Sequence, residues 1–159
     1  MNIFYLSKDP QQCAQYHCDK HVVKMILESA QLLSTAHRIL DVDTTLLVYK
    51  ATHKNHPSAI WCRQTSSNYT WLWSLLVELC SEYTYRYEKT HKCESSGLVD
   101  ILKKLPQSIP SGSFTDPPPA MPDEYKTRSS IQSYINYYKG AKASFATWKK
   151  RETPQWFSL

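Results

Sequence analysis

The sequence predicts a mainly α-helical fold, on three observations. Apolar residues from Lys20 to His91 recur three and four positions apart, which is the period of an amphipathic helix. Only 3 glycines occur among 159 residues, too few for the many tight turns of a sandwich or barrel. An apolar content of 42% with 21% charged residues is typical of a globular chain. We therefore expect a single compact helical domain over residues 1–159, with at most a short N-terminal strand.

Helix signals give the expected elements in order. Ile3–Leu6 is a short apolar run, either the N-terminal strand or a packed arm. Asp9 ahead of Pro10 is typical of a helix start, and Asp19 is expected to cap the long helix that follows. Pro57 should open another helix. The expected helices cover residues 10–16, 20–40, 58–65, 68–91, 98–104, 123–139 and 141–151, with one further helical turn at 46–50.

Residues 105–122 contain six of the nine prolines and are expected to form a long irregular loop. Such a long loop is unusual in a compact domain, so it is interpreted as a lid or an edge arm. Gly140 separates the last two expected helices. Trp156 and Phe157 form an aromatic tail that should dock on the body of the domain.

Cysteine usage and hydropathy point to the cytosol. The five cysteines are an odd number and no CxxC pair occurs, so we interpret them as reduced thiols, mostly in the core. The first residues lack the length and the basic flank of a signal peptide. No run of about 18 uncharged apolar residues is present, so we expect no membrane span.

The overall charge and aromatic content suit a phosphate-bearing partner. The net charge is +5, and 13% of the residues are aromatic. Cations contact phosphates, and aromatic rings stack on bases. The alternative is a basic surface over a tyrosine-rich core. No GxGxxG or GxxxxGK[ST] phosphate loop is present.

The first candidate site lies on the expected helix over residues 20–40. His21, Lys24 and Glu28 fall within two turns on one face of that helix. Lysine binds anions, histidine binds phosphate or transfers a proton, and glutamate can orient either. The alternative is an exposed, salt-bridged helix face, which is common on protein surfaces.

The second candidate site combines the end of this helix with a polar loop. Its histidines and amide offer directional hydrogen bonds, and its cations supply charge. The alternative is a solvated loop in which one histidine caps a helix. The residues are His37, Arg38, His53, Lys54, Asn55 and His56.

The third candidate site alternates cations with aromatic and amide side chains, an arrangement that can enclose a base. Its residues lie on the helices expected at 58–65 and 68–91. The alternative is that several of them belong to the core, because helix residues two apart point in different directions. The candidates are Arg63, Asn68, Tyr85 and Arg86.

We expect six of these side chains to converge on one pocket, because helices joined by short connections usually pack side by side. His21 is the difficulty, since it lies about 25 Å from Arg38 along a straight helix. An extended ligand, a helix break or a separate site would resolve the conflict. The six residues are His21, Lys24, Arg38, His53, His56 and Arg63.

Metal binding is not expected. His17, Cys18 and His21 lie close together in the sequence, yet no CxxC or HExxH spacing occurs. We therefore expect neither a metal nor a cofactor.

Six segments of the chain resemble a family of small proteins of tailed bacteriophages. The resemblance carries no activity of its own, but it implies a phage gene product in the cytoplasm of a bacterial host. The segments are MNIFYL at 1–6, CDKHVVKM at 18–25, AHR at 36–38, HKNHP at 53–57, EYTYRY at 82–87 and PAMP at 119–122.

The preferred function is binding of a phosphate-bearing nucleotide ligand in a basic, aromatic pocket, with sequestration of a host-defence nucleotide signal as one form of it. The alternative is an enzyme that acts on nucleotides or modifies DNA bases. A protein-directed inhibitor is a third reading. The expected partner is a nucleotide or another small phosphate-bearing molecule, nucleic acid is a second candidate, and a homo-oligomer is left open.

Overall fold

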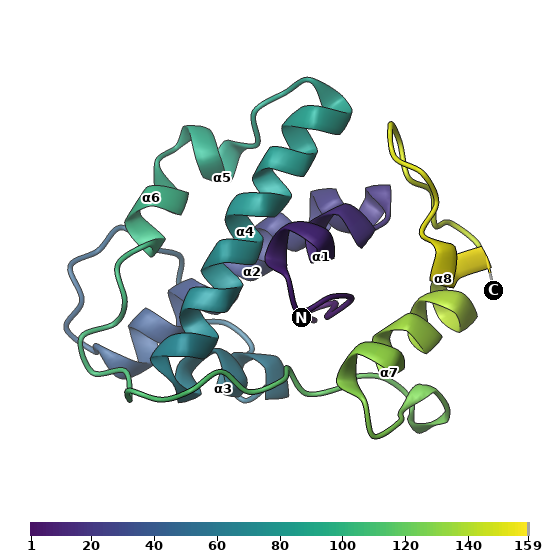
Figure 1. Ribbon diagram of the computed structural model, residues 1–159. Coiled ribbons are helices and arrows are strands. Elements are labelled where there is room, and N and C mark those ends of the chain that lie inside the picture. The colour runs from purple at the N-terminus through teal and green to yellow at the C-terminus, as the bar shows by residue number, and fades with distance from the viewer. Residues whose placement is uncertain (159) are drawn as a thin grey trace.

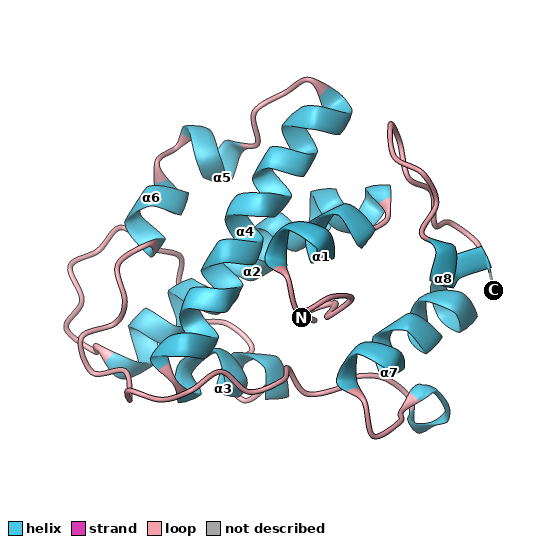
Figure 2. Ribbon diagram, viewed as in Figure 1, coloured by secondary structure: helices cyan, strands magenta, loops and turns pink. Residues whose placement is uncertain are grey.

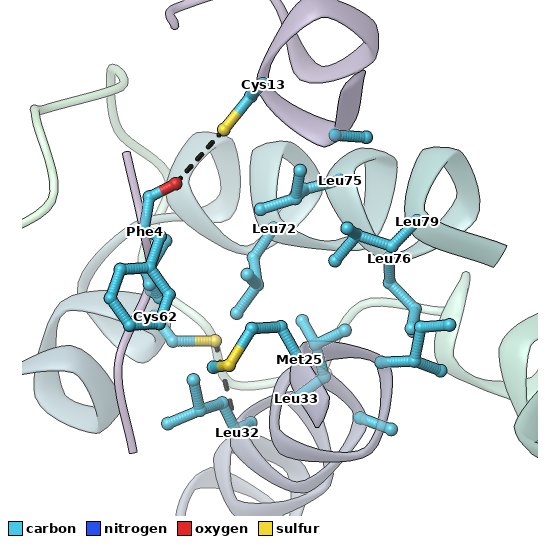
Figure 3. Close-up of a cluster of buried hydrophobic side chains, with 14 of the residues drawn as sticks. Phe4, Cys13, Met25, Leu32, Leu33, Cys62, Leu72, Leu75, Leu76 and Leu79 are labelled. Atoms are coloured by element: carbon cyan, nitrogen blue, oxygen red, sulfur yellow. Dashed lines mark hydrogen bonds between the residues drawn. The ribbon is translucent and has the colours of Figure 1, made fainter. Parts of the chain in front are cut away.

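Two long helices form the centre of the fold (Figure 1). Helix α2 spans Asp19–Leu40 and α4 spans Ser66–Tyr87, each with 22 residues. Figure 3 shows Met25, Leu32 and Leu33 of α2 facing a row of leucines on α4. These side chains are at most 2% exposed. Burying apolar area of this kind is the main favourable term in folding.

The computed structural model describes residues 1–158, and Leu159 of the expected domain lies outside them. Helix covers 56% of the chain and the described residues contain no strand, which confirms the mainly α fold. Figure 2 shows the helices joined by loops alone. The buried core extends from Ile3 to Trp148 as one cluster.

Two short helices start where the sequence predicts. Helix α1 spans Pro10–Tyr16, and the side chain of Asp9 accepts a hydrogen bond from the backbone N–H of Gln12. Helix α3 spans Pro57–Gln64, and His56 accepts from the N–H of Ser58. Proline fits the first position of both helices because its missing N–H would be unpaired there in any case.

The N-cap of α2 differs from the prediction. Cys18 is the N-cap of α2 and makes no side-chain capping bond. Asp19, the predicted cap, is the first residue of the helix and is bonded to Arg86 and Thr147 instead. Thr65 caps α4 by accepting from the N–H of Asn68.

Three segments are less helical than predicted. Residues 46–50 form no helical turn, and the carbonyls of Val48 and Tyr49 accept hydrogen bonds from Arg38 instead. The helix expected at 98–104 is reduced to residues 98–102, and helix is absent from 143–154. The remaining elements are α5 (Lys92–Ser95), α6 (Leu98–Leu102), η1 (Asp123–Tyr125), α7 (Ser130–Tyr137), the π-helical η2 (Tyr138–Lys142) and α8 (Gln155–Ser158).

Tertiary contacts explain the missing C-terminal helix. The carbonyl of Thr147 accepts a hydrogen bond from the N–H of Asp19, and the N–H of Lys149 donates to the Asp19 carboxylate. The backbone of this segment therefore covers the start of α2 rather than bonding to itself. Gly140 does not separate two helices but lies within η2, where any Cβ would collide with the ring of Tyr125. The aromatic tail docks as expected, with Trp156 packed against Tyr16 and Tyr138.

The proline-rich segment 105–122 is irregular, as predicted, and runs along α3 and the start of α4 (Figure 1). Asn68 accepts a hydrogen bond from the N–H of Thr115, and Trp61 donates to the carbonyl of Thr115. These bonds make the segment an edge arm.

All five cysteines are free and buried, in agreement with the prediction of reduced core thiols. Within residues 1–158, none of the helices combines the length and apolar character needed to span a bilayer.

Arg86 is the largest fully buried side chain, and it links three parts of the chain. Its guanidinium group forms ion pairs with Glu82 at 2.7 Å and with Asp19 at 2.9 Å. It also donates to the carbonyls of His17 and Gln15. The network joins the end of α4 to the end of α1 and the start of α2.

Replacing Arg86 with methionine should destabilise the protein by about 3–5 kcal/mol, because the buried Glu82 and the mostly covered Asp19 would both lose the guanidinium group that joins them. The matched control is Arg151→Met, which removes a 31% exposed partner of Glu82 and should cost about 1 kcal/mol or less. Urea unfolding measures both. Equal losses would contradict the central role of Arg86.

Candidate active site

The amino group of Met1 and the carboxylate of Glu28 form a close ion pair. The Met1 nitrogen lies 3.1 Å from Oε1 of Glu28, and the two side chains are 5% and 13% exposed. The second carboxylate oxygen, Oε2, is buried without a hydrogen-bond partner. Lys24 Nζ approaches that oxygen only to 3.8 Å, which is too long for a hydrogen bond. An amine thus lies beside a carboxylate that has an unused acceptor.

The N-terminal arm holds this amino group in place. Asn2 donates from Nδ2 to the carbonyl of Ala120, and Tyr5 donates to Asp116. The ring of Phe4 stacks on His21 with centroids 4.1 Å apart. In Figure 1 the N-terminus lies at the centre of the molecule, between α1 and α7. Residues far from Met1 in sequence therefore fix its position.

A groove of about 970 Å³ opens beside Glu28. Val23 and Leu27 of α2 form one wall and are 40% and 42% exposed. The loop residues Leu47 and Tyr49 lie across from α6, which contributes Leu98 and Ile101. The polar lining residues are Lys24, Glu28, Arg38, His91, Lys92 and Ser96. The groove is mainly apolar, with cations and one carboxylate in its lining.

Arg38 shapes the groove through the loop that it holds. Its guanidinium group donates to the carbonyl of Val48 at 2.7 Å and to that of Tyr49 at 3.1 Å. These bonds tie the loop to α2 at residues 48 and 49, and the neighbouring Leu47 is 83% exposed in the wall of the groove. Arg38 is therefore a structural donor as well as a charge.

His56 lies within electrostatic range of the ion pair. Burial lowers the pKa of His56 below its ordinary value, and the positive charges of the Met1 amino group and His53 lower it further. The Glu28 carboxylate acts in the opposite direction. Since Nδ1 of His56 accepts the N–H of Ser58, the neutral ring carries its proton on Nε2.

The structure brings together only part of the predicted set. Lys24, Glu28 and Arg38 line the groove, and His56 lies near the Met1–Glu28 pair. His53, Lys54 and Asn55 precede His56 in an exposed loop. Ligand binding by any of these residues stays a prediction.

Four of the predicted residues are buried and bonded within the fold. His21 contacts the hydroxyl of Tyr138 at 2.6 Å. His37 donates from Nε2 to the carbonyl of Lys104 at 2.8 Å. Asn68 fastens the edge arm, and Arg86 is enclosed by its ion-pair network. Their side chains are enclosed by the fold. Of the six residues expected to converge on one pocket, Lys24 and Arg38 line the groove, whereas His21, His53, His56 and Arg63 do not.

The remaining two predicted residues lie outside the groove. Tyr85 is 46% exposed, donates to the carbonyl of Lys150 and carries the guanidinium group of Arg151 over its ring at 4.2 Å. Arg63, in the last turn of α3, has a buried Nη1 without a hydrogen-bond partner.

Reasoning from residue types missed the Met1 amino group, because an N-terminal amine belongs to no side-chain motif. The available signal was the arm at Ile3–Leu6, whose apolar run indicates burial and thus draws the N-terminus into the fold. Leu47, Tyr49 and the α6 residues were also missed, since only tertiary packing places them opposite α2. Among residues 1–158, no three His, Cys, Asp or Glu side chains are grouped closely enough to hold a metal ion.

A family model described as pyrimidine dimer DNA glycosylase matches residues 1–95, more than half of the chain. The chain belongs to the pyrimidine dimer DNA glycosylase family. Neither the curated proteins nor the solved structures gave a match. The matched range includes the Met1–Glu28 pair and most of the groove but ends before α6.

This family is one of DNA-acting enzymes, so the match favours the predicted alternative of an enzyme that modifies DNA. It favours nucleic acid over a free nucleotide as the partner, and nothing in it supports sequestration of a nucleotide signal. The match carries no indication of a tailed-phage origin.

The histidines next to the N-terminal arm should make stability depend on pH. Burial lowers the pKa of His21 from 6.5 to about 2, with smaller contributions from His17, Lys142, Lys24 and Lys20. Below pH 6.5, His21 therefore binds a proton in the unfolded chain but stays neutral in the folded protein. Stability is complete above that pH and falls as the pH falls, by about 1.4 kcal/mol per unit for this one group.

The neutral variant His21→Gln should show a shallower decline in unfolding free energy between about pH 6 and pH 4.5. The slope is read from urea unfolding at several pH values, so a lower overall stability of the variant does not affect the comparison. Parallel slopes for the parent and the variant would show that His21 titrates normally.

Proposed function

We propose that this protein is a DNA glycosylase in which the Met1 amino group is the nucleophile and Glu28 transfers the protons. The observation that carries the proposal is the 3.1 Å separation of the amine and the carboxylate beside a groove. Among protein amines, an α-amino group is the one most readily neutral near physiological pH. Amines form Schiff bases at carbons of the carbonyl oxidation level, and C1′ of a deoxyribose is at that level.

The chemical steps balance with these two groups and water. The Met1 ammonium first loses a proton to water. The neutral nitrogen attacks C1′ of the deoxyribose, and the bond from C1′ to the base breaks. The base leaves with the bonding electron pair and takes a proton from water. The attacking nitrogen gives a proton to Glu28. The bond from C1′ to O4′ then opens, O4′ takes that proton, and a protonated imine joins Met1 to C1′. Water hydrolyses the imine, which frees the amine and leaves an abasic site.

Glu28 is suited to this proton transfer by its surroundings. Its Oε1 contacts the amine, while the buried Oε2 has no hydrogen-bond donor of its own. A buried acceptor without a partner is unfavourable in the resting protein, and a proton or a substrate hydroxyl would satisfy it. The carboxylate can therefore receive the proton of the attacking nitrogen and return it to O4′.

The groove suits a planar base next to the reacting sugar. Its volume of about 970 Å³ falls within the usual range for ligand sites. Val23, Leu27 and Tyr49 offer apolar and aromatic faces, while Lys24 and Lys92 add positive charge. The family description names pyrimidine dimers, and we propose that dimer-containing DNA is the substrate.

The test is base release from ultraviolet-irradiated duplex DNA, measured as alkali-labile sites. Glu28→Gln should lower the single-turnover rate by roughly 10²–10⁴-fold, the usual contribution of a general acid or base. Its matched control is Glu124→Gln, which removes an exposed carboxylate from η1 and should keep the parent rate.

A second arm of the experiment extends the chain by two residues ahead of Met1. The extension moves the free amine away from Glu28, so base release should be lost while the fold is kept. Parent-like rates for both Glu28→Gln and the extended chain would refute the proposal. Intact-mass measurement confirms which α-amine each protein carries.

A further inference from the structure

Three lysines lie around one row of aromatic rings. Lys20 Nζ lies 4.5 Å from the ring centroid of Phe145, and Lys142 Nζ lies 4.6 Å from that of Tyr137. Cations held on ring faces are attracted by the negative face of the ring. Both lysines are therefore given a defined position although they belong to different parts of the chain.

The rings between these lysines form a continuous row. Phe145 meets His21 edge to face at 5.7 Å, His21 stacks on Phe4 at 4.1 Å, and Phe4 stacks on Tyr137 at 6.3 Å. A lysine thus lies at each end of a row of four packed rings.

Lys24 adds a third cation on the same side of α2. It follows Lys20 by one helical turn, so the two lysines project from neighbouring positions, and its side chain is 63% exposed. All three lysines lower the pKa of His21, which places them within electrostatic range of one imidazole.

The carboxylates nearest to these lysines are bonded elsewhere. Asp19 accepts hydrogen bonds from Arg86, Thr147 and the N–H of Lys149. Glu28 is shared with the Met1 amine. Within residues 1–158, no carboxylate lies within 4.0 Å of Lys20 or Lys142. Lys24 lies 3.8 Å from Glu28, whereas Lys20 and Lys142 have no carboxylate to neutralise them locally, an arrangement that an anionic partner would stabilise.

We propose that Lys20, Lys24 and Lys142, here called the lysine row, bind phosphates of the nucleic acid strand that enters the groove. Lys24 also lines the groove, so the row is continuous with the proposed reaction site. That the strand is DNA rests on the proposed function.

The lysine row joins two parts of the sequence. Lys20 and Lys24 lie within the residues that the family model matches, whereas Lys142, Tyr137 and Phe145 lie beyond residue 95. The C-terminal segment therefore supplies part of the strand-binding surface. Phosphate contacts position a strand without reading its sequence.

The experiment measures binding of a duplex of about 20 base pairs, with and without a pyrimidine dimer, over a series of salt concentrations. Each phosphate contact contributes about 0.9 to the slope of log affinity against log salt. Lys20→Ala, Lys24→Ala and Lys142→Ala should each lower the slope by about that amount, and Lys142→Arg should restore it. The effect should be equal on both duplexes.

Lys103→Ala is the matched control. Lys103 follows α6, away from α7 in Figure 1, and lies 5.8 Å from the ring centroid of Trp73. Its replacement changes the net charge equally and should keep the parent slope. Parent-like slopes for the three row variants, or no DNA binding by the parent, would overturn the lysine row.

The outcome separates the row from the proposed chemistry. Reduced slopes with no base release by the parent would retain the row and reject the glycosylase. Base release by the parent with unchanged salt slopes for the three variants would reject the lysine row and retain the glycosylase.

Discussion

Burial of the N-terminal arm is the constraint on which the rest of the structure depends. Phe4 and Tyr5 are at most 5% exposed, enclosed by α2 on one side and by the edge arm and α7 on the other. An apolar arm that must be buried carries the charged Met1 amine inward with it. Glu28 is the partner that makes this burial tolerable, since an unpaired buried charge is costly. The same contact places an amine and a carboxylate beside the groove.

The charges of this protein divide into two groups with different tasks. Arg86 and Arg38 form bonds within the protein. Arg86 pairs with carboxylates, and Arg38 donates to loop carbonyls. Lys20 and Lys142 lie over aromatic rings, and their ammonium groups can still donate hydrogen bonds to a partner. The net charge of the sequence does not distinguish the arginines bonded inside the protein from the lysines at its surface. The separation follows from which cations the core encloses.

Helical periodicity was enough to predict the centre of the fold, because α2 and α4 bury continuous apolar stripes and their propensity agrees with their packing. It failed at 141–151, where the backbone pairs with Asp19 rather than with itself. In the candidate site, Lys24 and Glu28 were predicted from their spacing on one helix face. His21 belongs to the same stripe but is covered by Phe4 and Tyr138, partners distant in the sequence. Spacing along a helix shows which residues share a face. Whether that face is buried or exposed depends on segments distant in the sequence.

The proposed function depends on attack of the sugar by the Met1 amine and not by a lysine. Lys24 is the competing amine, since its Nζ is 3.8 Å from the same carboxylate. Borohydride supplies hydride to an imine and converts it to a stable secondary amine, which fixes the protein to the DNA. Tandem mass spectrometry of the digested adduct then locates the modified nitrogen. Attack by Met1 predicts a deoxyribose remnant on its α-nitrogen, whereas a remnant on Lys24, or the absence of any adduct during active base release, would contradict that role.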